Sequence, residues 1–133
     1  MITSEMPQFQ EFHIAGLQHI TPQNALKELQ NDTAIMIDVR EESEVKHENI
    51  PIRNVFYFPM SGIVDQVKNV PTGKPVIVIC NAGIRSLKVT KWLNLKGIHY
   101  TINLDGGIIV WKAMGLPVGS GFPNEINFSE FKL

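Results

Sequence analysis

Residues 76–86 read Val-Ile-Val-Ile-Cys-Asn-Ala-Gly-Ile-Arg-Ser, and this stretch decides the fold that the sequence predicts. Its first four residues are β-branched and apolar without interruption, which is typical of a strand buried on both faces of a parallel sheet. From Leu87 onward the apolar residues recur at helical spacing, and Gly97 ends that pattern. The sequence therefore places Cys80 in a tight loop between the carboxyl end of a strand and the amino end of a helix, where open α/β sheets bind ligands.

The residue types in this loop indicate a reactive thiol. Unpaired N–H groups at a helix N-terminus favour an anion, here the thiolate of Cys80. Gly83 permits a backbone angle or a close approach that a side chain would prevent, so the N–H groups of the loop can turn inward around the sulfur. Arg85 adds a permanent positive charge whose planar fork suits oxyanions. A buried structural cysteine is the alternative, and it explains Cys80 but not the glycine and arginine that follow it.

The rest of the chain alternates between predicted strands and helices. Apolar runs predict strands at residues 33–39, 54–58, 76–79 and 100–104. Helical patterns begin at Thr21-Pro22 and recur at 41–48, 63–67, 87–96 and 107–114. This alternation predicts βα units, and hence an α/β fold with a parallel sheet and helices on both of its faces.

Three segments resemble the signatures of one protein family. Residues 80–86 look like the active-site loop of rhodanese-family sulfurtransferases. Residues 37–41, together with Glu44, resemble the Asp-x-Arg signature of that family, and residues 106–118 are similar to its C-terminal signature. Residues 48–53 depart from the pattern, because the family usually has Gly-His-Ile-Pro-Gly-Ala where this chain has Glu-Asn-Ile-Pro-Ile-Arg.

The resemblance covers about residues 17–118 and implies a fold. We expect residues 1–133 to form a single rhodanese-like domain, with a central parallel sheet of about five strands and helices on both faces. Residues 1–16 and 119–133 extend beyond the resemblance and carry several aromatic side chains, among them Phe9 and Phe12. We expect these aromatics to pack on their own domain, the alternative being that they bury a dimer surface.

The resemblance also implies a reaction. Cys80 would take sulfane sulfur from a donor such as thiosulfate, hold it as a persulfide and pass it to a thiol or to cyanide. Arg85 would bind the anionic donor, and the N–H groups of the loop would hold the terminal sulfur. The residues predicted to bind substrate are therefore Arg85, Asn81, Ala82, Gly83 and Ile84. No metal and no organic cofactor is implied.

Two alternatives to this enzyme remain open. One is a persulfide carrier or a regulatory binding module of the same fold, because one fold supports many functions. The other, less favoured, is a related cysteine-dependent phosphatase or arsenate reductase. Such phosphatases resemble Cys-x5-Arg, whereas four residues separate Cys80 from Arg85 here. A shorter loop makes a narrower ring of N–H groups, which suits one sulfur atom better than three phosphoryl oxygens.

Composition narrows the class of protein and its partners. The formal net charge of −1 gives no electrostatic case for binding nucleic acid or an anionic membrane. A single cysteine cannot form an internal disulfide, and the N-terminus has neither a basic region nor an apolar core. We therefore expect a cytoplasmic protein, a monomer or a homodimer, whose partners are a small sulfur donor (thiosulfate or a persulfide) and a thiol acceptor.

The remaining charged and aromatic residues carry weaker expectations. Asp38 and Arg40 are expected to form a structural ion pair at the edge of the sheet, joined by Glu44. Trp111 is expected to pack in the core. The four histidines are scattered and match no metal-binding spacing, although one of them could still fold beside Cys80.

Overall fold

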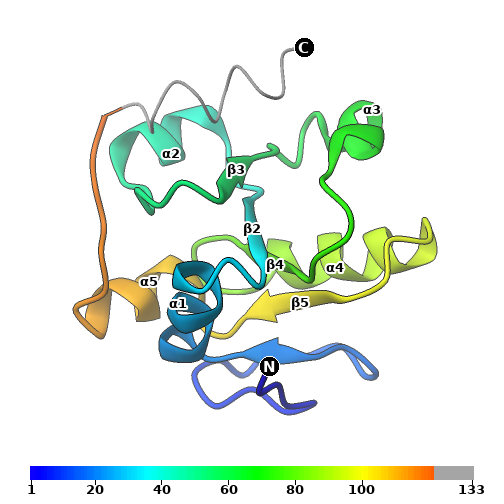
Figure 1. The fold of residues 1–133 in the computed structure, drawn as a ribbon, viewed down its shortest axis with the longest axis horizontal. Helices are drawn as coiled ribbons and strands as arrows, with labels where there is room; N and C mark the ends of the chain where they lie inside the picture. The colour runs from blue at the N-terminus through cyan, green and yellow to red at the C-terminus, as the bar shows by residue number, and fades with distance from the viewer. Residues whose placement is uncertain (122–133) are drawn as a thin grey trace.

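The computed structural model of the chain describes residues 1–121 and contains one five-stranded sheet in the order β1-β5-β4-β2-β3 (Figure 1). Every neighbouring pair of strands is parallel, as predicted. The strands are β1 (His19–Ile20), β2 (Ile35–Asp38), β3 (Val55–Tyr57), β4 (Val76–Ile79) and β5 (Thr101–Leu104). Strand β1 was not predicted from the apolar pattern, because two residues are too few to establish a period.

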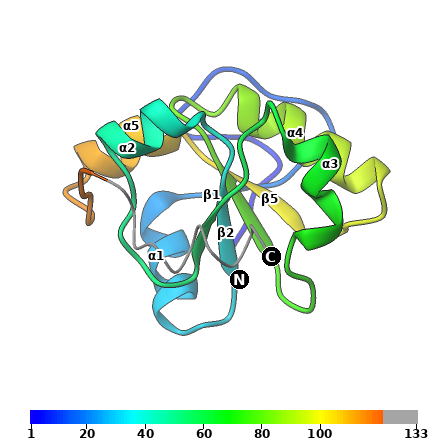
Figure 2. The same ribbon diagram turned by 90° about the horizontal axis from the view of Figure 1, so that it is seen from above.

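The helices lie on both sides of this sheet, which confirms the predicted architecture. They are α1 (Pro22–Gln30), α2 (Glu42–His47), α3 (Ile63–Gln66), α4 (Arg85–Leu95) and α5 (Gly107–Ala113), with a 3-10 turn η1 (Val67–Asn69). Figure 2 shows α1 and α5 on one side of the strands and α3 and α4 on the other. In the part of the chain that the structure describes, no helix has the length and apolar content needed to cross a membrane.

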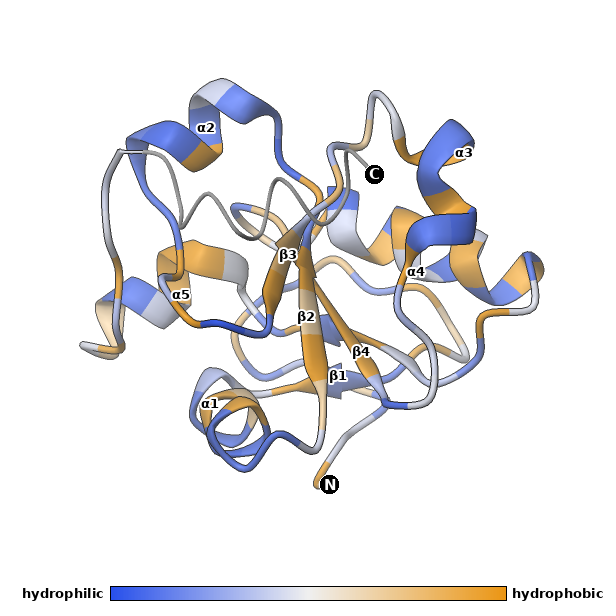
Figure 3. Cartoon of the chain, turned by 45° about the horizontal axis from the view of Figure 1, so that its top comes forward, coloured by the Kyte–Doolittle hydropathy of each residue, from blue (hydrophilic) through white to orange (hydrophobic). Residues whose placement is uncertain are grey.

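Side chains of the central strand β4 pack into two separate hydrophobic cores. Ile77 and Ile79 point into one core, whereas Val76, Val78 and Cys80 point into the other, as the alternation of side chains along a strand requires. Figure 3 shows the hydrophobic colour concentrated on the strands and on the inner sides of the helices that cover them.

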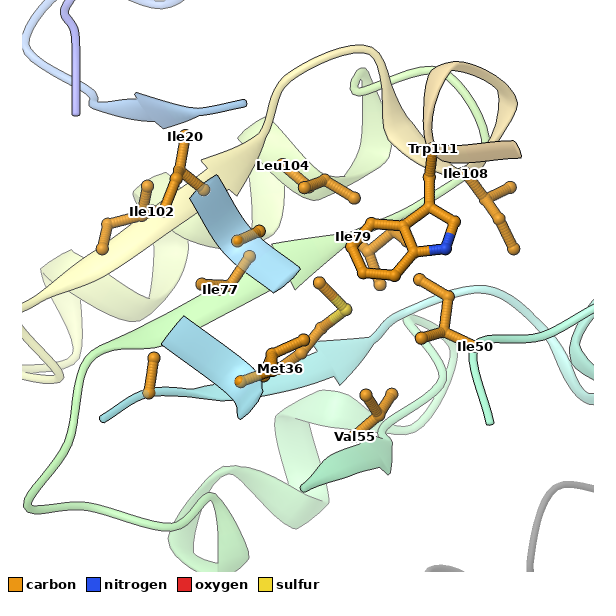
Figure 4. Close-up of a cluster of buried hydrophobic side chains, with 13 residues drawn as sticks. Ile20, Met36, Ile50, Val55, Ile77, Ile79, Ile102, Leu104, Ile108 and Trp111 are labelled. Atoms are coloured by element: carbon orange, nitrogen blue, oxygen red, sulfur yellow. The ribbon is translucent and has the colours of Figure 1, made fainter. Parts of the chain in front are cut away.

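Trp111 fills the first of these cores, as predicted. Its indole ring is fully buried and lies beside Ile50 and Ile79 (Figure 4). The indole N–H donates to the carbonyl oxygen of Pro117 at 2.8 Å, so the one polar atom of the ring is also satisfied. This bond ties the segment after α5 to the core.

The sheet topology creates a crevice where β2 and β4 end. These two strands are neighbours, but the chain leaves β2 through α2 and leaves β4 through α4, which lie on opposite sides of the sheet (Figure 2). Diverging connections of this kind open a crevice at the carboxyl edge of a parallel sheet. Asp38 is the last residue of β2 and Cys80 directly follows β4, so both lie at this crevice.

The N-terminal segment is joined to the domain by backbone hydrogen bonds. Ser4 pairs with His19 in an antiparallel bridge, and the backbone N–H groups of Gln8 and Phe9 donate to the carboxylate of Asp105. Phe9 and Phe12 are 40% and 37% exposed, so each is covered in part by its own domain. The aromatic residues predicted to pack from the C-terminal extension lie beyond the described residues.

A buried ion pair lies at the carboxyl end of β2. Arg40 donates from Nε and Nη2 to both carboxylate oxygens of Asp38, at 3.0 and 2.8 Å, and from Nη2 to the carbonyl oxygen of Glu48 at 2.7 Å. Arg40 and Asp38 are 2% and 3% exposed, which confirms the structural pairing predicted from the sequence.

Replacing Arg40 with alanine should therefore destabilise the domain strongly, because it leaves the Asp38 carboxylate buried without its partner. We expect the free energy of unfolding to fall by about 3–5 kcal/mol in urea denaturation. Arg53→Ala, which removes an exposed arginine, is the matched control and should change stability by less than about 0.5 kcal/mol. Equal effects of the two substitutions would show that the ion pair has no structural role.

Candidate active site

The sulfur of Cys80 lies against the backbone of the loop that follows β4. Gly83 N–H donates to Sγ at 3.1 Å and Ser86 N–H donates at 3.3 Å, while the Ser86 hydroxyl lies 3.2 Å away. Cys80 is 1% exposed. Two backbone donors on one buried sulfur make a small anion site, because N–H groups stabilise negative charge where water does not.

The loop that follows Cys80 is anchored to α5 through two of its carbonyl groups. Ile108 N–H donates to Cys80 O at 3.0 Å, and Ile109 N–H donates to Asn81 O at 3.2 Å. These are first-turn N–H groups, which have no partner inside their own helix. Gly107 permits the contact, because its φ is +67° and an added Cβ would overlap the backbone of Cys80 and Asn81.

Gln10, from the N-terminal segment, binds a third carbonyl of the loop, that of Gly83. Its Nε2 donates to Gly83 O at 3.1 Å and to Phe12 O at 2.7 Å. Its Oε1 accepts from Gly106 N–H at 2.8 Å and from Asn103 Nδ2 at 3.1 Å. Gly83 has a φ of +87°, and a side chain there would overlap Gln10, so the loop requires glycine at this position.

The partners of Gln10 also fix the direction of the hydrogen bonds that lead to the sulfur. Asn103 must turn its amino group toward Gln10 Oε1, so its Oδ1 faces Ser86. The Ser86 hydroxyl then uses its only hydrogen on Asn103 Oδ1, at 2.5 Å. The Ser86 hydroxyl therefore has no hydrogen left for Cys80, and in their 3.2 Å contact only a protonated Cys80 could be the donor.

Two histidines continue this buried chain toward the surface. Asn103 Nδ2 lies 3.1 Å from His19 Nδ1, so that ring nitrogen is the acceptor. His19 Nε2 then donates to His13 Nδ1 at 2.9 Å. Burial is the main cause of a lowered pKa of His19, with His13 lowering it further and Asp105 opposing, which agrees with a neutral ring.

Arg85 and Glu44 form the second charged pair of the site. The two terminal nitrogens of Arg85 donate to the two carboxylate oxygens at 2.7 and 2.8 Å. This hydrogen bonding is the main cause that lowers the pKa of Glu44 to about 2 and also raises the pKa of Arg85. Asn81 joins this pair to the first one, because it donates to Glu44 at 3.1 Å and accepts from Arg40 at 3.4 Å. The predicted network of Glu44 with the Asp38–Arg40 pair is therefore confirmed.

The predicted substrate-binding residues thus lie in different surroundings. Gly83 faces the sulfur with its N–H group, while Asn81 and Arg85 bind Glu44 with their side chains. Ala82 and Ile84 lie on the exposed side of the loop. The second donor to the sulfur is Ser86 N–H, one residue beyond the predicted set.

Three residues of the site were not predicted from the sequence: Gln10, Asn103 and His19. Each joins the hydrogen-bond network of the loop from a distant part of the chain, so no local spacing in the sequence marks it. The histidine that the sequence left open as a partner of Cys80 does not contact the sulfur; His19 is linked to it only through Asn103 and Ser86. Within residues 1–121, no three His, Cys, Asp or Glu side chains are grouped so as to hold a metal ion.

Comparison with known proteins identifies the family. The model of the rhodanese-like domain matches residues 21–114. The chain belongs to the rhodanese-like domain family. It is 30% identical over 87 residues to a sulfurtransferase of Allochromatium vinosum, covering 65% of this chain and 79% of that protein. A thiosulfate sulfurtransferase, GlpE, of Glaesserella parasuis is 26% identical, covering 77% of this chain and 94% of that protein.

A solved structure agrees with the match in sequence. A rhodanese-related protein from Thermoplasma volcanium superposes with a TM-score of 0.68 at 27% identity, over 76% of this chain and 96% of that one. The relatives also include a tRNA uridine(34) hydroxylase of Bacillus velezensis, which is 26% identical and of which this chain covers 30%. The relatives named as sulfurtransferases support a sulfurtransferase-type function for this chain.

A single isosteric change tests whether Gln10 shapes the loop. Gln10→Glu keeps the acceptor for Gly106 and Asn103 but replaces an N–H donor with an oxygen that repels the carbonyl groups of Gly83 and Phe12. We expect alkylation of Cys80 by iodoacetamide at fixed pH to change at least about threefold, and stability to fall by about 1–3 kcal/mol. Gln8→Glu puts the same charge on an exposed side chain of the same segment and should change neither. Unchanged alkylation in Gln10→Glu would show that Gln10 does not shape the sulfur site.

Proposed function

We propose that this protein is a sulfurtransferase that carries sulfane sulfur as a persulfide on Cys80 and delivers it to a thiol or to cyanide. The observation that carries the proposal is the position of Cys80 Sγ under the N–H groups of Gly83 and Ser86, in a loop with four residues between cysteine and arginine. N–H groups so placed favour a sulfur that bears negative charge, both as an attacking thiolate and as the end of a persulfide.

The reaction divides into two displacements at sulfur. In the first, the Cys80 thiolate attacks the outer sulfur of the donor, the donor's own bond to that sulfur breaks, and the remainder leaves with the electron pair as sulfite or as a thiolate. In the second, an acceptor thiolate or cyanide attacks the terminal sulfur of the persulfide and restores the Cys80 thiolate. No electrons are gained or lost overall. Because Cys80 is the only cysteine, the acceptor comes from outside the chain.

The buried sulfur and the short loop also argue against the rival phosphatase. A phosphoryl group needs donors around three oxygens at about 2.9 Å, whereas a persulfide adds only one atom, which is bonded to Sγ. The persulfide-carrier alternative uses the same residues and differs in receiving its persulfide from a partner protein. A regulatory binding module would have an inactive loop, so the intact Cys80, Gly83 and Arg85 disfavour it.

Cys80→Ser should abolish sulfur loading while keeping the fold, because a hydroxyl fills nearly the same space but is a far weaker nucleophile. We expect the intact mass of the natural chain to rise by one sulfur atom after incubation with a sulfane-sulfur donor, and that of the serine variant to stay unchanged. Denaturation midpoints of the two proteins should agree closely.

The same preparation should hydrolyse aryl phosphates at a negligible rate. Loading that persists in Cys80→Ser would exclude the persulfide mechanism. Rapid phosphatase turnover that depends on Cys80 would instead favour the rival enzyme and show that loop length does not select the substrate.

A further inference from the structure

We infer, on the basis of the proposed function, that the site takes its sulfur from the persulfide of an organic thiol in preference to the thiosulfate dianion. The observation is that Glu44 occupies the Arg85 fork on which binding of an anionic donor would depend. Because Arg85 holds this carboxylate through both terminal nitrogens, its end-on fork is used and its charge is neutralised.

Glu44 is held too firmly to be displaced easily by a donor. Besides the two bonds from Arg85, its carboxylate accepts from Asn81 Nδ2 at 3.1 Å and from the backbone N–H of Glu41 at 3.0 Å. The last bond belongs to the capping box at the start of α2, so Glu44 is anchored by its own helix. A thiosulfate ion that replaced Glu44 would break four hydrogen bonds and leave a carboxylate beside the dianion.

The other charges of the site do not replace the attraction for a dianion that Arg85 loses through its pairing with Glu44. Arg40 is buried against Asp38 and Glu48, so the two arginines of the site are balanced by two carboxylates. Ionisation of Cys80 then makes the local charge negative. A dianion approaches such a site against repulsion, whereas the reacting end of an R–S–SH donor carries at most one charge.

The surface around the loop suits an organic donor. Ile84, within the loop, is 46% exposed. An exposed apolar side chain in the loop can contact the carbon body of a thiol, and it offers nothing to an inorganic ion.

The loading step that follows from this is balanced without a further reactant. The Cys80 thiolate attacks the outer sulfur of R–S–SH and forms a new S–S bond as the S–S bond of the donor breaks. The products are the Cys80 persulfide, which keeps the hydrogen of the donor's SH group, and R–S⁻, which takes a proton from water.

The experiment measures the rate of single-turnover loading by intact mass, with sodium thiosulfate and with the persulfide of mercaptoethanol as the two probes. In Glu44→Gln, the ratio of the thiosulfate loading rate to the persulfide loading rate should rise about fivefold, because the substitution removes one negative charge from the site. Glu42→Gln removes an exposed charge from the same helix and is the matched control, which should leave both rates within about twofold. In the natural chain, added salt should accelerate loading from thiosulfate, because it screens a repulsion, and Glu44→Gln should lose this acceleration.

Several results would overturn the inference. A ratio of the two rates that falls or stays level in Glu44→Gln would do so, as would an equal change of that ratio in Glu42→Gln. Salt that slows the thiosulfate reaction of the natural chain would show attraction instead of repulsion, and this result needs no variant. If neither probe adds sulfur to Cys80, the proposed function itself fails, which is a distinct outcome.

Discussion

The Cys80 loop depends on one constraint: its backbone is held from outside by groups that come from distant parts of the chain. The first turn of α5 binds Cys80 O and Asn81 O, and Gln10 binds Gly83 O. Gly83 and Gly107 are required because both contacts are closer than a Cβ allows. The helix after β5 thereby supports the candidate site, whose cysteine directly follows β4.

Charge in the site is paired before any ligand arrives. Arg40 is bound by Asp38 and Arg85 by Glu44, and Asn81 connects the two pairs. These ion pairs hold the end of β2, the start of α2 and the loop in one arrangement, so they organise the crevice at the edge of the sheet. The dipoles that face Cys80 Sγ come from the backbone, because Gly83 N–H and Ser86 N–H lie 3.1 and 3.3 Å from it.

The sequence was sufficient for the features that rest on local pattern. The apolar run at 76–79 and the helical period after Leu87 predicted the strand, the helix and the loop between them, because each is encoded within a dozen residues. Gln10 and Asn103 were missed, since they are 93 residues apart and meet only through the pairing of β5 with its neighbours. The ion pair of Arg85 was predicted only in part. Glu44 was expected in a charge network, but which arginine it would neutralise depends on how α2 is placed against the loop. Side chains that act across the sheet become predictable only once strand order is known.

The most direct test of this account is a crystal structure of the protein after reaction with a sulfane-sulfur donor. The account predicts one additional atom bonded to Cys80 Sγ, with its free side within hydrogen-bond distance of backbone N–H groups of residues 81–85. The carbonyl groups of Cys80, Asn81 and Gly83 should keep their present partners in α5 and Gln10. An unmodified Cys80, or a terminal sulfur directed away from the loop backbone, would contradict the claim that this loop is built to hold sulfur.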